Sequence, residues 1–135
     1  MAYEIKEIEG IGPASAEKLA KAKIATTDDL LKLCGHAAGR KEVAEKTGVS
    51  EAQILTWSNL ADLMRVSGIG PQYSELLKAS GVDTIKELRQ RNAENLAEKM
   101  KEINEKKKLA RVSPAAKVVA GWIEKAKTME PKITH

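Results

Sequence analysis

Two short segments of the sequence have the residue types of an anion-binding turn. One reads Ile8-Glu9-Gly10-Ile11-Gly12 and is followed by Pro13, and the other reads Val66-Ser67-Gly68-Ile69-Gly70 and is followed by Pro71. Glycine adopts positive φ and lets a ligand approach the backbone closely, and proline suits the first turn of a helix. N–H groups at a helix start lack intrahelical partners and lie at the positive end of the helix dipole. Each segment is therefore a candidate site for a phosphate or another anion.

The two segments open a longer internal repeat with an offset of 58 residues. The matching pairs downstream are Glu17 and Glu75, Leu19 and Leu77, Ile24 and Val82, Thr26 and Thr84, and Leu30 and Leu88. A repeat of this length predicts two related structural units. We place them at residues 1–65 and 66–135. Because no proline-rich or serine-rich linker separates them, we expect one compact body.

Composition and periodicity predict an all-α fold of about eight main helices. We expect helices over residues 14–23, 28–33, 40–47, 71–78 and 85–89, with longer ones starting after residues 50, 92 and 113. The predicted N-caps are Thr27, Ser50, Asp83 or Thr84, Asn92, and Ser113 followed by Pro114. We expect the segment from Pro131 to His135 to be loosely held.

Aliphatic side chains must form most of the core, since the chain has no phenylalanine. Trp57 and Trp122 occupy comparable places in the two units, which indicates core anchors. On the last helix we expect a buried side formed by Val118, Val119, Trp122, Ile123 and Ala126. Tyr73 could stack on a base or a partner, but a position one turn after a glycine turn favours packing against a neighbouring helix.

Charge is distributed unevenly along the chain. Residues 1–67 hold 9 Lys and Arg against 10 Asp and Glu, whereas residues 68–135 hold 14 against 9, within a total net charge of +4. The densest basic cluster is Lys106, Lys107, Lys108 and Arg111. An anionic partner should therefore prefer the second unit, although glutamates are interleaved and a solvated helix end is the alternative.

The repeated pattern of Gly-Ile-Gly-Pro, then glutamate, then leucine resembles the helix-hairpin-helix motif of DNA polymerases, ligases, nucleases and repair glycosylases. The resemblance implies an all-α fold of two tandem helix-hairpin-helix units, each followed by two longer helices. It also implies backbone amides that contact DNA phosphates without reading sequence. Carried over by position, those amides belong to Gly10, Gly12 and Ala14 in the first hairpin and to Gly68, Gly70 and Gln72 in the second.

Some members of that family hold a monovalent cation on hairpin carbonyls. The corresponding carbonyls are those of Ile8 and Ile11, and of Val66 and Ile69; we expect no other cofactor. A lysine often stands two residues after the second glycine, where this chain has Ala14 and Gln72. Lys18 and Lys78 lie further along each helix and could reach a phosphate through solvent. Glu9 would repel a phosphate at the first hairpin.

Nearly the whole chain also resembles an uncharacterised bacterial family of tandem helix-hairpin-helix proteins, which has no established activity. The segments that carry this resemblance are residues 8–13, 47–50, 62–65, 68–70 and 104–107. The leading hypothesis is thus non-enzymatic, sequence-independent binding of DNA or another nucleic acid. The competing hypothesis is a protein-interaction or scaffold module in which the hairpins are purely structural.

Residues 43–54 resemble a helix-turn-helix, with a second helix from Ser50 that would present Glu51, Gln53 and Thr56 to a DNA groove. The alternative, which we favour, is a capped corner between two packed helices. Cys34 and His36 are too few ligands for a zinc site, and no catalytic triad or phosphate-binding loop is present. With neither a signal peptide nor a membrane-spanning stretch, we expect a non-enzymatic cytoplasmic protein.

Overall fold

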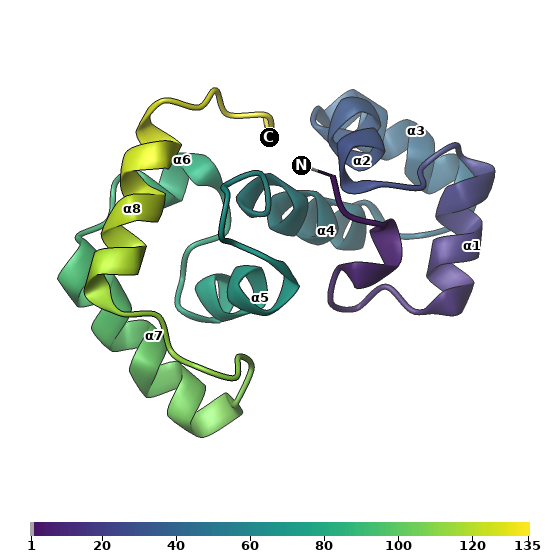
Figure 1. Ribbon diagram of the computed structural model, residues 1–135. Helices are drawn as coiled ribbons and strands as arrows, with labels where there is room; N and C mark the ends of the chain where they lie inside the picture. Colours follow the sequence, from purple (N-terminus) through teal and green to yellow (C-terminus); the bar gives the residue numbers. More distant parts are fainter. Residues whose placement is uncertain (1) are drawn as a thin grey trace.

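The computed structural model describes residues 2–135, and Figure 1 shows its helices. Glycine followed by proline, or a short polar side chain, stands at most of the helix starts. Within residues 2–135 a 3-10 helix precedes eight α-helices, and the one β-type contact is an isolated bridge between Glu4 and Thr26. The prediction of an all-α fold is therefore confirmed. The elements are η1 (Ile5–Glu7), α1 (Pro13–Lys21), α2 (Thr27–Cys34), α3 (Ala37–Thr47), α4 (Glu51–Leu63), α5 (Pro71–Ala79), α6 (Ile85–Leu88), α7 (Ala93–Lys107) and α8 (Ala116–Lys127).

Three predicted helix starts are confirmed by their hydrogen bonds. Ser50 Oγ accepts the N–H of Gln53 at 3.1 Å, and Asn92 Oδ1 accepts the N–H of Asn95 at 3.0 Å. Of the two candidates before α6, Thr84 is the cap, since its side chain accepts the N–H of Glu87 at 3.3 Å. In each case a short polar side chain satisfies an amide that the first helical turn leaves without a partner.

The predicted cap at Thr27 is wrong, because the N-cap of α2 is Thr26. Thr26 Oγ1 accepts the N–H of Asp29, and Asp29 Oδ2 accepts the N–H groups of Ala25 and Thr26. These bonds, the one from Ala25 foremost, lower the pKa of Asp29. Thr27 is buried instead, and its hydroxyl accepts the N–H of Tyr3. Two adjacent threonines carry the same local signal for an N-cap. Contacts with distant parts of the chain therefore decide which of the two caps the helix.

The predicted start of the last helix at Ser113 and Pro114 is also wrong. The helix α8 begins at Ala116 after the extended residue Ala115. The hydroxyl of Ser113 instead accepts a hydrogen bond from Asn104 Nδ2 at 3.1 Å. Asn104, which engages the Ser113 hydroxyl in place of the start of α8, lies nine residues upstream on α7.

The core consists of two hydrophobic clusters, one in each half of the chain. Figure 1 shows α4 and α5 in the middle, with α1, α2 and α3 on one side and α7 and α8 on the other. Both tryptophans are buried as predicted, Trp57 in the first cluster and Trp122 in the second. Val118 is 47% exposed, so its predicted burial is wrong.

The two halves repeat each other in backbone detail after α1 and α5. The N–H of Ile24 bonds to the carbonyl of Leu19, and the N–H of Val82 bonds to that of Leu77, both at 2.9 Å. The residue that makes this turn has positive φ in both copies, 67° at Lys23 and 93° at Gly81. The first copy thus places a lysine in a conformation that favours glycine.

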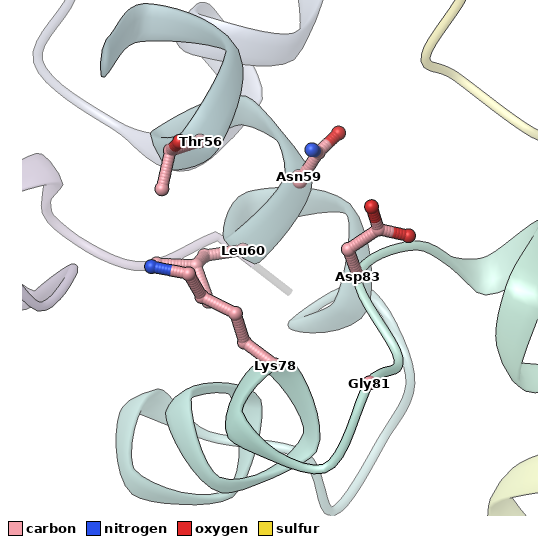
Figure 2. Close-up of a pocket in the computed structure, with 6 residues that line it drawn as sticks. All are labelled: Thr56, Asn59, Leu60, Lys78, Gly81 and Asp83. Carbon is pink, nitrogen blue, oxygen red and sulfur yellow. The ribbon is translucent and has the colours of Figure 1, made fainter. Parts of the chain in front are cut away.

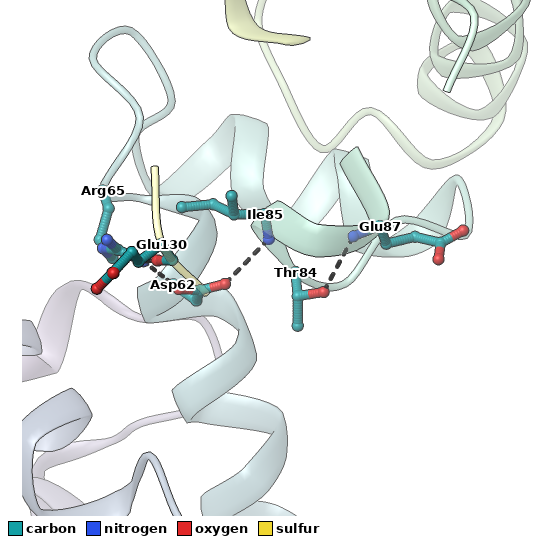
Figure 3. A network of polar contacts seen from close by, with 6 residues as sticks. All are labelled: Asp62, Arg65, Thr84, Ile85, Glu87 and Glu130. Carbon is teal, nitrogen blue, oxygen red and sulfur yellow. Dashed lines mark hydrogen bonds and ion pairs between the residues drawn. The ribbon is translucent and has the colours of Figure 1, made fainter. Parts of the chain in front are cut away.

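Asp62 joins the last helix of the first half to the second half (Figure 3). Its side chain is fully buried; Oδ2 accepts the N–H of Ile85 at 2.9 Å, and Oδ1 accepts Arg65 Nη1 at 2.8 Å. Arg65 Nη1 also donates to the carbonyl of Glu130 at 2.8 Å. One carboxylate therefore stabilises the start of α6 and, through Arg65, positions the segment after α8. Its burial is tolerable because both oxygens are hydrogen-bonded.

The segment after α8 is held against the first half, contrary to the prediction that it is loose. The N–H of Thr134 bonds to the carbonyl of Gly35 at 2.8 Å, and Arg40 Nη2 donates to the carbonyl of Thr134 at 2.6 Å. Arg40 is itself buried and also donates to the carbonyls of Cys34 and Gly35. These contacts span more than ninety residues of sequence, so no local pattern could reveal them.

Replacing Gly35 with alanine should displace this segment. A Cβ at Gly35 would lie 2.5 Å from the carbonyl oxygen of Lys132 and 2.7 Å from that of Leu31. We expect Gly35→Ala to lower the free energy of unfolding in urea by about 1–3 kcal/mol and to speed hydrogen exchange of the Thr134 amide. The control is Gly121→Ala on α8, where a Cβ meets nothing within 4 Å. Unchanged stability and exchange in Gly35→Ala would contradict the docking of this segment.

Candidate nucleic-acid interface

The two Gly-Ile-Gly-Pro turns have the same backbone geometry. Gly10 and Gly68 have φ of 94° and 99°. The N–H of Ile11 bonds to the carbonyl of Ile8 at 3.1 Å, and the N–H of Ile69 bonds to that of Val66 at 3.0 Å. Each of these carbonyls keeps a second lone pair, so both stay candidates for the cation contact predicted from the sequence.

The six amides predicted as phosphate donors make no hydrogen bond within residues 2–135. Five of the six residues are exposed, and Gly70 is partly exposed. The second glycine of each turn is the N-cap of the following helix, and the first amides of a helix have no partner within it. Unpaired amides at a helix start can bind an anion. The donors are Gly10, Gly12 and Ala14, and Gly68, Gly70 and Gln72.

A tryptophan indole lies against the first glycine of each turn. A Cβ built on Gly10 would meet Trp57 Nε1 at 3.3 Å, and one on Gly68 would meet Trp122 Nε1 at 3.0 Å. The indoles come from α4 and α8, the longer helices that end each half. The close approach explains why the turn needs glycine for space as well as for its positive φ.

The second turn adjoins part of the predicted basic cluster through Gln72. One shallow hollow of about 570 Å³ is lined by Tyr3, Gly68, Gly70, Pro71, Gln72 and Tyr73. A second hollow of about 500 Å³ is lined by Gln72, Asn104, Lys108, Leu109, Ala110 and Arg111. Because Gln72 lines both hollows, the free amides of the turn and two cationic side chains lie along one continuous surface.

The loop that carries these cations is fixed at two places. Asn104 is buried; its Oδ1 accepts the N–H of Ala110 at 2.9 Å, and its Nδ2 donates to the carbonyl of Ala110 at 3.0 Å. Tyr73 packs on Trp122 with ring centroids 5.2 Å apart, and its hydroxyl donates to the carbonyl of Val112 at 3.1 Å. This confirms the packing role expected for Tyr73. A fixed loop loses less conformational entropy when it binds a ligand.

The surroundings of the two turns differ in charge. The exposed Glu9 of the first turn corresponds to Ser67 of the second. Lys125 Nζ of α8 donates to the carbonyl of Ser67 at 3.1 Å, which adds a cation beside the second turn. The sequence carries no local signal for Lys125 at this turn, because its partner Ser67 lies 58 residues upstream. A negative charge at the first turn and a positive charge at the second make the surroundings of the second turn more favourable for an anion.

The other members of the basic cluster are arranged differently. Lys106 lies 3.9 Å from Glu102, one turn away on α7, so its charge is partly neutralised. Lys107 is exposed and lines neither hollow. Within residues 2–135, neither Lys108 nor Arg111 forms an ion pair. Lys108 and Arg111 are therefore the members of the cluster that the fold brings to the second turn.

Comparison with known proteins identifies a family for this chain. Residues 9–129 match the model of a family described as Domain of unknown function (DUF4332), which covers both turns and most of the helices. The chain belongs to that family. Among proteins with curated descriptions and among solved structures, none matches the chain. Membership of the DUF4332 family therefore agrees with the resemblance seen in the sequence and assigns no activity.

Lys78 of this DUF4332 domain lies at the end of α5 that is away from the second turn. It stands in the last turn of α5 and lines a hollow of about 260 Å³ with Thr56, Asn59, Leu60, Gly81 and Asp83. Figure 2 shows its ammonium on the side of Thr56 and Leu60, with the Asp83 carboxylate on the other side. Lys18 stands in the corresponding last turn of α1. Both lysines are thus at the opposite helix end from the free amides.

The segment that resembles a helix-turn-helix forms a corner whose second helix buries one face. The turn is made by Gly48 with φ of 78°, and α4 follows it. Helices α2, α3 and α5 all contact α4, which buries Ile54, Trp57, Leu60 and Ala61. A recognition helix needs a face that can enter a groove. The buried face of α4 in this DUF4332 domain fits the corner that we favoured, whereas Glu51 and Gln53, which the alternative directs to a groove, are exposed.

Cys34 and His36 do not form a reactive pair in this DUF4332 domain. Cys34 is fully buried, and burial raises its pKa to about 11, so the thiol stays protonated at neutral pH. His36 Nδ1 lies 3.2 Å from the hydroxyl of Thr134. Within residues 2–135 no group of three His, Cys, Asp or Glu side chains is arranged to hold a metal ion, and no helix is long and apolar enough to cross a membrane.

The turn glycines should differ in their tolerance of a side chain. Alanine at Gly68 combines a positive φ with a 3.0 Å approach to Trp122. We expect Gly68→Ala to lower the free energy of unfolding by about 1–2 kcal/mol or more, and Gly10→Ala to behave similarly. Gly12→Ala is the control, since Gly12 has φ of −85° and a Cβ there meets nothing within 4 Å. Equal stability of Gly68→Ala and Gly12→Ala in urea denaturation would contradict this account of the turn.

Proposed function

We propose that this DUF4332 protein is a non-enzymatic nucleic-acid-binding protein that grips phosphates without reading sequence. The second Gly-Ile-Gly-Pro turn supplies the amides of Gly68, Gly70 and Gln72. The adjoining loop supplies Lys108 and Arg111. DNA is the first candidate because the tandem turns resemble helix-hairpin-helix units.

One observation carries the proposal, namely that Gln72 lines both hollows beside the second turn. Amides alone would bind a single anion weakly in water. Amides followed by two unpaired cations along one surface match the repeated charge of a phosphodiester backbone. Sequence-independent binding follows from the same chemistry, because phosphate contacts position a nucleic acid and carry no base information.

The first turn has a structural role in this proposal. It has the same free amides as the second, but Glu9 stands on it and its half of the chain is slightly acidic. A monovalent cation on the hairpin carbonyls is compatible with either turn. At the second turn the Lys125 ammonium donates a hydrogen bond to the carbonyl of Ser67, which is next to Val66.

A protein-interaction module is the second candidate. Val112 and Val118 are 66% and 47% exposed, and they lie on the loop before α8 and on α8 itself. A contiguous exposed apolar patch is typical of a docking surface for another protein, and these two valines are the large hydrophobic side chains that the second half exposes within residues 2–135. In that case the turns only shape the fold. Substitutions at Val112 and Val118 would then weaken the binding of a protein partner and leave any affinity for nucleic acid unchanged.

The direct test is a fluorescence-anisotropy titration of labelled DNA at about 50 and 200 mM salt. We expect binding that weakens with salt. Lys108→Glu combined with Arg111→Glu should reduce affinity more than about tenfold and lower the salt slope by about two. The control reverses the same number of charges on the first unit, with Lys32→Glu and Lys41→Glu, and should change affinity little. Absence of binding at low salt would refute the proposal.

Positions 14 and 72 allow a matched comparison of the two turns. Both are exposed residues two places after the second glycine. A carboxylate at Gln72 would lie beside the bound phosphate, so we expect Gln72→Glu to weaken DNA binding about fivefold and Gln72→Lys to strengthen it. Ala14→Glu should have little effect. Equal losses in Gln72→Glu and Ala14→Glu would show that the two turns bind alike.

A further inference from the structure

The hollow over the second turn contains an aromatic side chain from the other half of the protein. Tyr3 lines it together with residues 68 and 70–73. The Tyr3 hydroxyl oxygen lies 3.7 Å from the position that a Cβ on Gly70 would occupy. The hydroxyl end of the Tyr3 side chain therefore lies close to Gly70, whose amide belongs to the proposed phosphate contact.

The backbone of Tyr3 is firmly held. Its N–H donates to Thr27 Oγ1 at 3.1 Å, and its carbonyl accepts the N–H of Thr27 at 2.9 Å. The side chain is partly buried and packs against the first hydrophobic cluster. The ring is thus positioned by α2 of the first half and presented to the turn of the second half, so the hollow forms when both halves are folded together.

The two tyrosines of the hollow differ in their contacts. Tyr73 is committed to the protein, because its ring packs on Trp122 and its hydroxyl bonds to Val112. The Tyr3 hydroxyl makes no hydrogen bond among residues 2–135, and Tyr3 is a partly exposed residue that lines the hollow. Tyr3 is therefore the aromatic group available to a ligand at this place.

An aromatic ring beside a phosphate site selects for unpaired bases. In a duplex the faces of the bases are stacked on each other, and a protein reaches phosphates and groove edges. In a single strand the faces are accessible, and stacking on an aromatic side chain adds to phosphate binding without sequence preference. Lys108 and Arg111 in the next hollow continue the path of a flexible backbone.

We infer that the second turn binds single-stranded nucleic acid in preference to duplex, with one phosphate on the amides of Gly68 and Gly70 and the adjacent base stacked on Tyr3. This inference rests on the proposed nucleic-acid binding and specifies its ligand. It assigns Tyr3 to the site, although the residue lies more than sixty positions from the turn in sequence.

The test compares oligothymidylate and a mixed-sequence duplex by anisotropy, with the full chain, Tyr3→Leu and Tyr3→Phe. We expect the full chain to bind the single strand more tightly. Tyr3→Leu should lose at least about fivefold in affinity for the single strand, and Tyr3→Phe should retain most of it. The affinity of Tyr3→Leu for duplex should equal that of the full chain, which also shows that the variant is folded.

Each outcome bears on one of the two proposals. Duplex bound as tightly as the single strand, or single-strand affinity unchanged in Tyr3→Leu, would overturn this inference and leave nucleic-acid binding intact. Failure of the full chain to bind either oligonucleotide at low salt would overturn the proposed function and this inference together. Loss of both single-strand and duplex binding in Tyr3→Leu, with an unfolding transition like that of the full chain, would also overturn the preference, since Tyr3 would then act without regard to base pairing.

Discussion

The contact between a glycine and a tryptophan indole is the constraint on which both halves of the protein depend. Gly10 and Gly68 turn the chain with positive φ, and Trp57 and Trp122 fill the space that a side chain would need. The contact joins the beginning of each unit to its last long helix. The turn amides themselves make no hydrogen bond within residues 2–135. Fold and candidate site therefore share one backbone requirement.

The two copies keep the same backbone and differ in the charges around it. Backbone bonds after α1 and α5 agree within 0.1 Å, and the same caps start the following helices. The side chains that would decide ligand binding are Glu9 in one copy and Ser67 with Lys125 in the other. Two copies of one fold can thus keep the same backbone while the side chains around one copy alone favour an anionic partner.

Much of the fold could be predicted because its signals are local. Proline and glycine mark the starts of α1 and α5. Ser50, Thr84 and Asn92 each cap a helix by accepting the N–H of the residue three positions later. Predictions failed where a distant partner decided the outcome. Ser113 bonds to Asn104 instead of capping α8, and Thr134 binds Gly35 across the molecule.

The candidate site shows the same division. The free amides follow from the turn sequence, and the basic cluster follows from composition. Which cations lie near the turn depends on the loop that Asn104 holds. Sequence proximity does not show that Lys106 lies 3.9 Å from Glu102, whereas Lys108 shares a hollow with Gln72. Tyr3 and Lys125 come from elements outside the turn and had no local signal. Lys78 lies at the far end of α5 from the turn amides. The spacing in the sequence was enough to predict this separation, because an α-helix rises 1.5 Å per residue.

The buried Arg40 links the folding of the first half to the rest of the chain. Its guanidinium is satisfied by carbonyls of Cys34 and Gly35 and by that of Thr134, which is 94 positions downstream. During synthesis on a ribosome, the first half emerges long before residue 134 does. Until then Arg40 must remain hydrated and the end of α2 uncovered, so the first half reaches its final packing only after almost all of the second has been made.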